Sequence, residues 1–226
     1  MKKIDIFYAT LRAKKFERLN DFYYYCIDCA SDGIALDIGS DDFLGLTKKL
    51  LDKQWVGEIN AFDFKDLEVE NNKIGFYRGD FSETIPSFLK NNDNKISILE
   101  IDLREPLPLA SRFSDLKGSK VNDILTLCSD HFKDDVVIIV NEFMCYEYDN
   151  VHLDGYSLAD FFEDNNKSYE CLGYFPYNLG DDSELLGNEG TTAWVVSDSK
   201  SLQGSDLKNL INQLWAHSPC EKIKKG

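Results

Sequence analysis

A chain of 226 residues, 43% of them hydrophobic, is long enough to bury a substantial core in a single α/β domain. Acidic residues outnumber basic residues by 40 to 25, and the net charge of −15 opposes binding to nucleic acid and to anionic membranes. No apolar run is long enough for a signal-peptide core or a membrane span, so we expect a cytoplasmic protein with neither nucleic-acid nor membrane partners.

The six cysteines and three histidines do not form a complete metal motif. Cys26 and Cys29 make a C-x-x-C, which is found in redox pairs and in half zinc sites. No second C-x-x-C and no H-x-x-x-H follows in the chain. We therefore expect reduced thiols on an aromatic helix face.

Residues 33–63 read as a β-α-β unit. An apolar run over 34–38 predicts a strand, which breaks at Gly39. Leucines at helical spacing follow, and a second strand ends at Asp63. In nucleotide-binding folds an acid at this point, roughly 20 residues past the first turn, binds a ribose. The unit is therefore a candidate nucleotide-binding half of a parallel sheet.

The rest of the chain continues the alternation of strands and helices. A helix is predicted near the N-terminus, over about 4–29, with one apolar face. A short helix begins at Ser82, with Pro86 in its first turn. The remaining predicted strands are 73–80, 96–102, 135–141, 168–175 and 191–197, and the remaining predicted helices are 115–131, one that ends near 162, and 205–215.

This order predicts a Rossmann-like α/β fold with a seven-stranded, mostly parallel sheet and helices on both faces. The last two strands have no helix between them, so we expect the last strand to be antiparallel. That arrangement is typical of class I S-adenosylmethionine (SAM) methyltransferases. We expect one compact unit, with residues 1–32 as a helical extension and 33–226 as the methyltransferase-like domain.

Several segments resemble the macrocin O-methyltransferase family over about residues 33–162. They are GIALDIG, INAFDF, RGDFSETIPSFL, ISILEID, VVIIVNEF and LDGYSLADFF, of which RGDFSETIPSFL is the most specific. The resemblance implies methylation of a sugar hydroxyl, with SAM as the methyl donor and a divalent metal, usually Mg²⁺. It also implies a small-molecule acceptor such as a sugar or nucleotide-sugar; a homo-oligomer is left open.

The resemblance also implies the site residues. The cofactor residues are Asp37, Gly39, Asp63 and Asp80. The metal ligands are Asp102, Asn141 and Glu142, since Mg²⁺ prefers oxygen ligands. The catalytic residues are Asp102 and Glu142, with His152 from the following loop as a candidate general base. Acids at strand ends also cap helices, which is the alternative for Asp63 and Asp80, and a surface position is the alternative for His152.

Two departures from the family pattern leave a second function open. Asp41 and Asp42 stand where the family has a further glycine, and their charges would repel the carboxylate of SAM. Arg104 replaces an acid of the metal motif, and its cation could pair with Asp102 or Glu142. The alternative to an enzyme is a catalytically inactive methyltransferase-fold protein that acts as a binding or assembly subunit.

Overall fold

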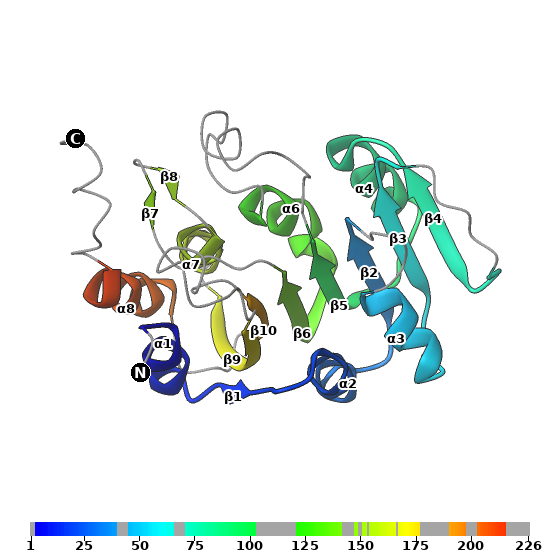
Figure 1. Ribbon diagram of the computed structural model, residues 1–226. Helices are drawn as coiled ribbons and strands as arrows, with labels where there is room; N and C mark the ends of the chain where they lie inside the picture. The colour runs from blue at the N-terminus through cyan, green and yellow to red at the C-terminus, as the bar shows by residue number, and fades with distance from the viewer. Residues whose placement is uncertain are drawn as a thin grey trace.

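The computed structural model describes residues 3–39, 45–65, 71–102, 121–141, 147–148, 151–152, 154–165, 167–176, 190–197 and 203–215. Its centre is an eight-stranded sheet (Figure 1). The strands of that sheet are β1 (Lys14–Lys15), β2 (Ile34–Ile38), β3 (Ile59–Asp63), β4 (Ile74–Arg78), β5 (Ile96–Ile101), β6 (Phe132–Val140), β9 (Ser168–Pro176) and β10 (Gly190–Ser197). A separate small hairpin consists of β7 (Glu147–Tyr148) and β8 (Val151–His152).

The strand order is β1-β9-β10-β6-β5-β2-β3-β4. Every neighbouring pair is parallel except the two made by β10, which runs antiparallel to β6 and β9. The predicted α/β class and the antiparallel last strand are therefore confirmed, and the count is eight instead of seven because β1 adds a two-residue edge. The chain runs outward from β2 to β4 and then returns to β5 on the other side of β2. Ligands of such sheets bind at this switch point, outside the carboxyl ends of the strands.

Helices cover both faces of the sheet (Figure 1). One face carries α1 (Lys3–Thr10), α4 (Phe81–Lys90), α6 (Val121–Cys128, followed by the 3-10 turn Ser129–His131), α7 (Asp154–Asp164) and α8 (Gly204–Trp215). The other face carries α2 (Leu19–Cys29) and α3 (Leu46–Asp52). Every residue of β2, β5 and β10 is buried, which explains their continuous apolar sequences. None of the described helices combines the length and apolar character that a membrane span needs.

The prediction of one N-terminal helix over 4–29 is wrong. The chain turns at Arg12, which has a left-handed φ of 57°, and β1 then pairs with β9 before α2 begins. Phe7 on α1 belongs to one core, whereas Phe22 and Cys26 on α2 belong to the core on the opposite face of the sheet. The apolar spacing continues through the turn because both halves bury a face, although they bury it against different sides of the sheet.

The start of α4 also differs from the prediction. The helix begins at Phe81, so Pro86 lies in its second turn and not in its first. Proline has no N–H, and the Ser82 carbonyl therefore loses its intrahelical partner. The predicted helix over 115–131 is described only from Val121, and its last three residues form the 3-10 turn. The four described cysteines, including Cys26 and Cys29, are free thiols.

Candidate functional site

Four polar side chains meet at the carboxyl ends of the central strands. Asp37 lies in β2, Glu100 in β5, Asp102 directly after β5, and Asn141 directly after β6. Alternate residues of a strand point to the same face, so these side chains share the face covered by α2 and α3. Their exposed fractions are 2%, 1%, 6% and 7%. Polar groups buried to this degree need hydrogen-bond partners.

Glu100 is at the centre of this cluster. The hydroxyl of Tyr23, from α2, donates to Oε1 of Glu100. Asn141 Nδ2 lies 2.6 Å from the same oxygen, and the backbone N–H of Leu46 donates to Oε2 at 2.7 Å. Both oxygens of Glu100 are therefore held by neutral donors.

Asn141 connects Glu100 to Asp102. Its Nδ2 lies 3.1 Å from Asp102 Oδ2, and its Oδ1 accepts a hydrogen bond of 2.7 Å from the Thr191 hydroxyl on β10. The amide orientation follows from this arrangement, because the nitrogen faces carboxylate acceptors and the oxygen faces a donor. We call Tyr23, Glu100, Asp102, Asn141 and Thr191 the buried polar cluster.

Two carboxylates cap the N-terminus of α3. Glu100 accepts from Leu46 N, and Asp37 Oδ2 accepts from Thr47 N at 3.0 Å and from the Thr47 hydroxyl at 2.6 Å. A helix N-terminus carries partial positive charge, so acids from β5 and β2 stabilise it. In this chain the amides of Leu46 and Thr47 are therefore bonded to the protein itself.

Burial changes the acid–base properties of the cluster. Burial, followed by the nearby charge of Asp37, raises the pKa of Glu100 to about 8, although its hydrogen-bond donors act in the opposite direction. Burial and the charge of Glu100 raise the pKa of Tyr23 well above its ordinary value, so this hydroxyl remains a donor at neutral pH. Glu100 consequently exchanges a proton in a pH range where an ordinary glutamate is fully ionised.

Gly39 follows β2 and has a φ of 82°. A side chain there would place Cβ 1.6 Å from the carbonyl oxygen of Asp102. The need for glycine thus has a source inside the protein, since the chain after β2 passes directly over the chain after β5. Asp102 N also donates to Ile38 O at 2.8 Å, which holds the two strand ends together.

The other two predicted cofactor residues differ from each other. Asp63 ends β3 and is 7% exposed; its Oδ1 accepts from Lys65 N at 2.8 Å, and no other hydrogen bond to its carboxylate is formed within the described ranges. Asp80 caps α4, because its Oδ1 accepts from the backbone N and the hydroxyl of Ser82 at 2.8 and 2.7 Å. The capping alternative therefore describes Asp80, whereas Asp63 keeps an unused carboxylate oxygen.

The described residues do not fit a Mg²⁺ site. Asn141 presents nitrogen, not oxygen, to the carboxylates of Glu100 and Asp102, and turning the amide would bring its oxygen against both. No group of three or more His, Cys, Asp or Glu side chains suited to a metal occurs among the residues the structure describes. Glu142, Arg104 and the side chain of His152 lie outside the described part, although the backbone of His152 ends the strand β8.

Sequence reasoning missed three members of the buried polar cluster: Tyr23, Glu100 and Thr191. One signal was available, because Glu100 is the only charged residue in the apolar strand 96–101. An acid at such a position needs donors from a neighbouring element. Which element supplies them depends on how α2 and β10 pack, and no local pattern shows that.

No protein-family model matches the sequence, and no curated protein matches it either. Two solved structures show the same fold. A suspected hemolysin from Lactococcus lactis aligns with a TM-score of 0.53 and 11% identity, over 86% of this chain and 93% of the other. The O-methyltransferase segment of StiE aligns with a TM-score of 0.51 and 9% identity, over 88% of this chain and 79% of the other. Together with the strand order, these alignments show that the chain has the Rossmann-like fold of class I methyltransferases.

Proposed function

We propose that the protein is a SAM-dependent O-methyltransferase that transfers a methyl group to a hydroxyl of a sugar or a related small molecule. The observation that carries the proposal is Asp63. It ends the strand next to the switch point, it is almost fully buried, and one of its carboxylate oxygens is unused by the described residues. An acid at this position of an open α/β sheet accepts hydrogen bonds from a ribose.

The residues of the chain would divide the work as follows. When bound, SAM supplies a methyl group on a positively charged sulfur. Asp63 holds the ribose hydroxyls, and the acids at the ends of β2 and β5 give the cleft a negative potential that favours a cation. Asp102 lies at the switch point, and Asn141 orients its carboxylate. Asp102, Glu142 and His152 are the candidates to take the proton of the acceptor hydroxyl as its oxygen bonds to the methyl carbon.

Mg²⁺ has no step in this proposal, because the described residues do not fit it. We expect that a chelator leaves both cofactor binding and methyl transfer unchanged. Recovery of activity by added Mg²⁺ after chelation would show that Glu142 and other residues outside the described ranges complete a metal site.

The first test is isothermal titration calorimetry with SAM and with S-adenosylhomocysteine, each with and without Mg²⁺. We expect micromolar binding that Asp63→Ala weakens by at least about tenfold, equivalent to about 1.4 kcal/mol. Asp134→Ala is the matched control, because it removes the same charge from an exposed position in β6. Its affinity should equal that of the wild type.

The inactive binding subunit is the second candidate. It is favoured by the two carboxylates that already bond to the N-terminal amides of α3. It predicts no heat with either ligand at millimolar concentration. That result would reject the methyltransferase proposal while leaving the fold assignment intact.

A further inference from the structure

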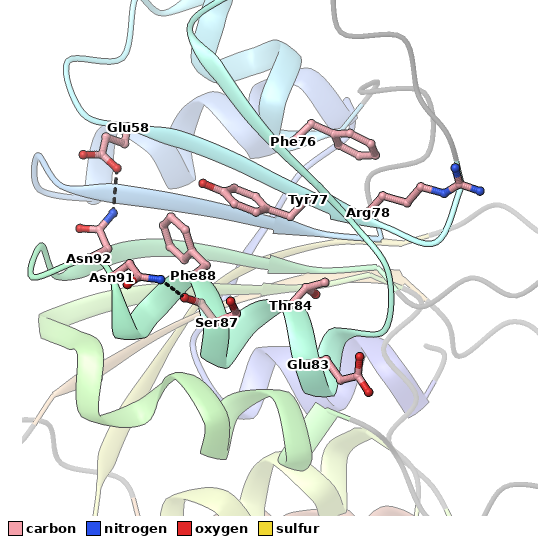
Figure 2. A pocket seen from close by; sticks show the side chains of 10 residues that line it. All are labelled: Glu58, Phe76, Tyr77, Arg78, Glu83, Thr84, Ser87, Phe88, Asn91 and Asn92. Atoms are coloured by element: carbon pink, nitrogen blue, oxygen red, sulfur yellow. Dashed lines mark hydrogen bonds between the residues drawn. The ribbon is translucent and has the colours of Figure 1, made fainter.

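A second candidate site lies away from the switch point, in a hollow of about 700 Å³ between the edge strand β4 and helix α4 (Figure 2). Tyr77 and Phe88 form its aromatic wall, and Glu58, Ser87 and Asn91 contribute polar groups. None of these residues belongs to the buried polar cluster or to the predicted cofactor residues. A pocket of this size with few polar groups and an aromatic wall is typical of small-molecule sites.

The aromatic wall is held in place by the core. The Tyr77 ring stacks on Phe62 of the neighbouring strand, with ring centres 4.9 Å apart and planes within 17°. It also meets Phe88 at 5.1 Å and 60°. Since β4 is the last strand at this end of the described sheet, no further strand covers the ring face turned away from Phe62. That face is available for stacking against a ligand.

The polar groups of the hollow are fixed but not saturated. Asn92 and Asn94 donate to the two oxygens of Glu58 at 2.9 and 3.1 Å, and a carboxylate can accept further bonds. Asn91 Nδ2 donates to the backbone carbonyl of Ser87 at 2.9 Å, which leaves its Oδ1 to face a ligand (Figure 2). Neither the Ser87 hydroxyl nor the Tyr77 hydroxyl has a hydrogen-bond partner in the described part of the chain.

An unusual neighbour supports the same position. Gly75 on β4 lies opposite Asn60 on β3, and a Cβ at Gly75 would be 2.5 Å from Asn60 Oδ1 and 3.4 Å from the Tyr77 hydroxyl. The glycine therefore makes room for the amide beside Tyr77. Asn60 is 4% exposed, and its Nδ2 has no partner among the described residues. The wall at Tyr77 thus contains unused hydrogen-bonding capacity at two adjacent groups.

Charge narrows the class of ligand. The hollow contains the acids Glu58 and Glu83 and the base Arg78, in a protein with a net charge of −15. Phosphates and other anions are disfavoured there. A neutral ring with an apolar face and several hydroxyls fits better, because each hydroxyl can both donate and accept.

We propose that the hollow binds a neutral carbohydrate ring, with its C–H face on Tyr77 and its hydroxyls bonded to Glu58, Ser87 and Asn91. This inference goes beyond the proposed function and does not depend on SAM, since it concerns another side of the molecule. It assigns to α4 and β4 a role in recognition in addition to their role in the core.

The test is a titration of the full ¹⁵N-labelled chain with methyl glucoside, methyl galactoside and methyl mannoside, followed by amide NMR shifts. We expect saturable shifts in β4 and α4 with at least one of the three, at millimolar concentration. Ser87→Ala and Tyr77→Phe should each weaken this binding about fivefold, as expected for one lost hydrogen bond. Ser205→Ala and Tyr24→Phe are the matched controls, because both lie on helices outside the hollow.

Three results would overturn the proposal. The first is an absence of saturable shifts with all three methyl glycosides up to about 50 mM, a concentration well above the expected affinity. The second is tighter binding of adenosine or glucose 6-phosphate at the same amides, which would assign the hollow to a base or an anion. The third is equal affinity in wild type, Ser87→Ala and Tyr77→Phe. Asp63→Ala should bind the methyl glycoside normally, so failure at one site is distinguishable from failure at the other.

Discussion

The polar side chains next to β5 and β6 bond to one another, whereas those next to β3 and β4 keep unused hydrogen-bonding capacity. Tyr23, Glu100, Asn141 and Thr191 form a continuous network. Asp63, Tyr77 and Ser87 have few or no side-chain partners within the described residues. The difference indicates that the first region is a structural framework and that ligands bind on the second side.

The cover over each region explains this difference. Helix α2 lies over β5 and β6 and inserts Tyr23 into the buried polar cluster, so that water is excluded and every polar group needs a protein partner. No strand pairs with the outer edge of β4 in the described sheet, and α4 lies along only one of its faces. A polar group there can be satisfied by solvent or by a ligand.

Replacing Asn141 should have the largest effect on the framework. Asn141→Ala removes donors from Glu100 and Asp102 and leaves the Thr191 hydroxyl without its acceptor. We expect the free energy of unfolding to fall by about 3–4 kcal/mol. Urea denaturation would measure this loss. Asn209→Ala, at an exposed position of α8, should change stability by less than about 0.5 kcal/mol. Equal effects of the two variants would contradict the comparison.

The second effect concerns pH. The pKa of Glu100 is raised from 4.5 to about 8 in the folded protein. Between these values the folded state holds a proton that the unfolded state releases, so Glu100 stabilises the fold at low pH and this contribution is lost as pH rises to about 8. We expect the wild type to lose on the order of 3 kcal/mol across this range relative to Glu100→Gln.

Denaturation of both proteins at pH 5 and pH 8.5 measures this difference. Glu100→Gln is expected to be the less stable protein at pH 5, because its amide turns a donor toward other donors. The decisive quantity is therefore the change with pH and not the stability at one pH. Parallel stability curves for the two proteins would show that Glu100 does not titrate in this range.

The smallest effect concerns the hydroxyl that α2 contributes. Tyr23→Phe keeps the packed ring and removes the donor to Glu100. We expect a loss of about 1–2 kcal/mol in the free energy of unfolding. Tyr24→Phe, whose hydroxyl is 3.4 Å from an exposed carboxylate of Asp52, should lose less than about 0.5 kcal/mol. If Tyr23→Phe is as stable as the wild type, α2 is only a hydrophobic cover.

Much of the fold could be predicted from local patterns. The strands over 34–38, 59–63 and 96–101 were identified because central parallel strands are apolar on both faces. The antiparallel position of β10 followed from the missing helix between the last two strands. The N-terminal helix was predicted as one element because its apolar spacing is continuous. Only the packing of α1 and α2 on opposite faces reveals the break at Arg12.

The candidate site was predicted less well, for a physical reason. The carboxyl ends of parallel strands meet at one edge, so the order of the strands brought Asp37, Asp63, Asp102 and Asn141 to that edge without further information. Hydrogen-bond partners far apart in sequence carry no such regularity. Tyr23 is 77 residues from Glu100, and Thr191 is 50 residues from Asn141.

The amino-acid sequence by itself determined the order of strands and helices, the α/β class and the edge of the sheet at which acids gather, because these follow from apolar periodicity and chain direction. The tertiary structure alone decided which acids bond to the protein and which retain capacity for a ligand. Asp37 and Asp80 cap helices, Glu100 lies under α2, and Asp63 keeps an unused oxygen. The cause is that burial and donors depend on elements that meet only when the chain has folded.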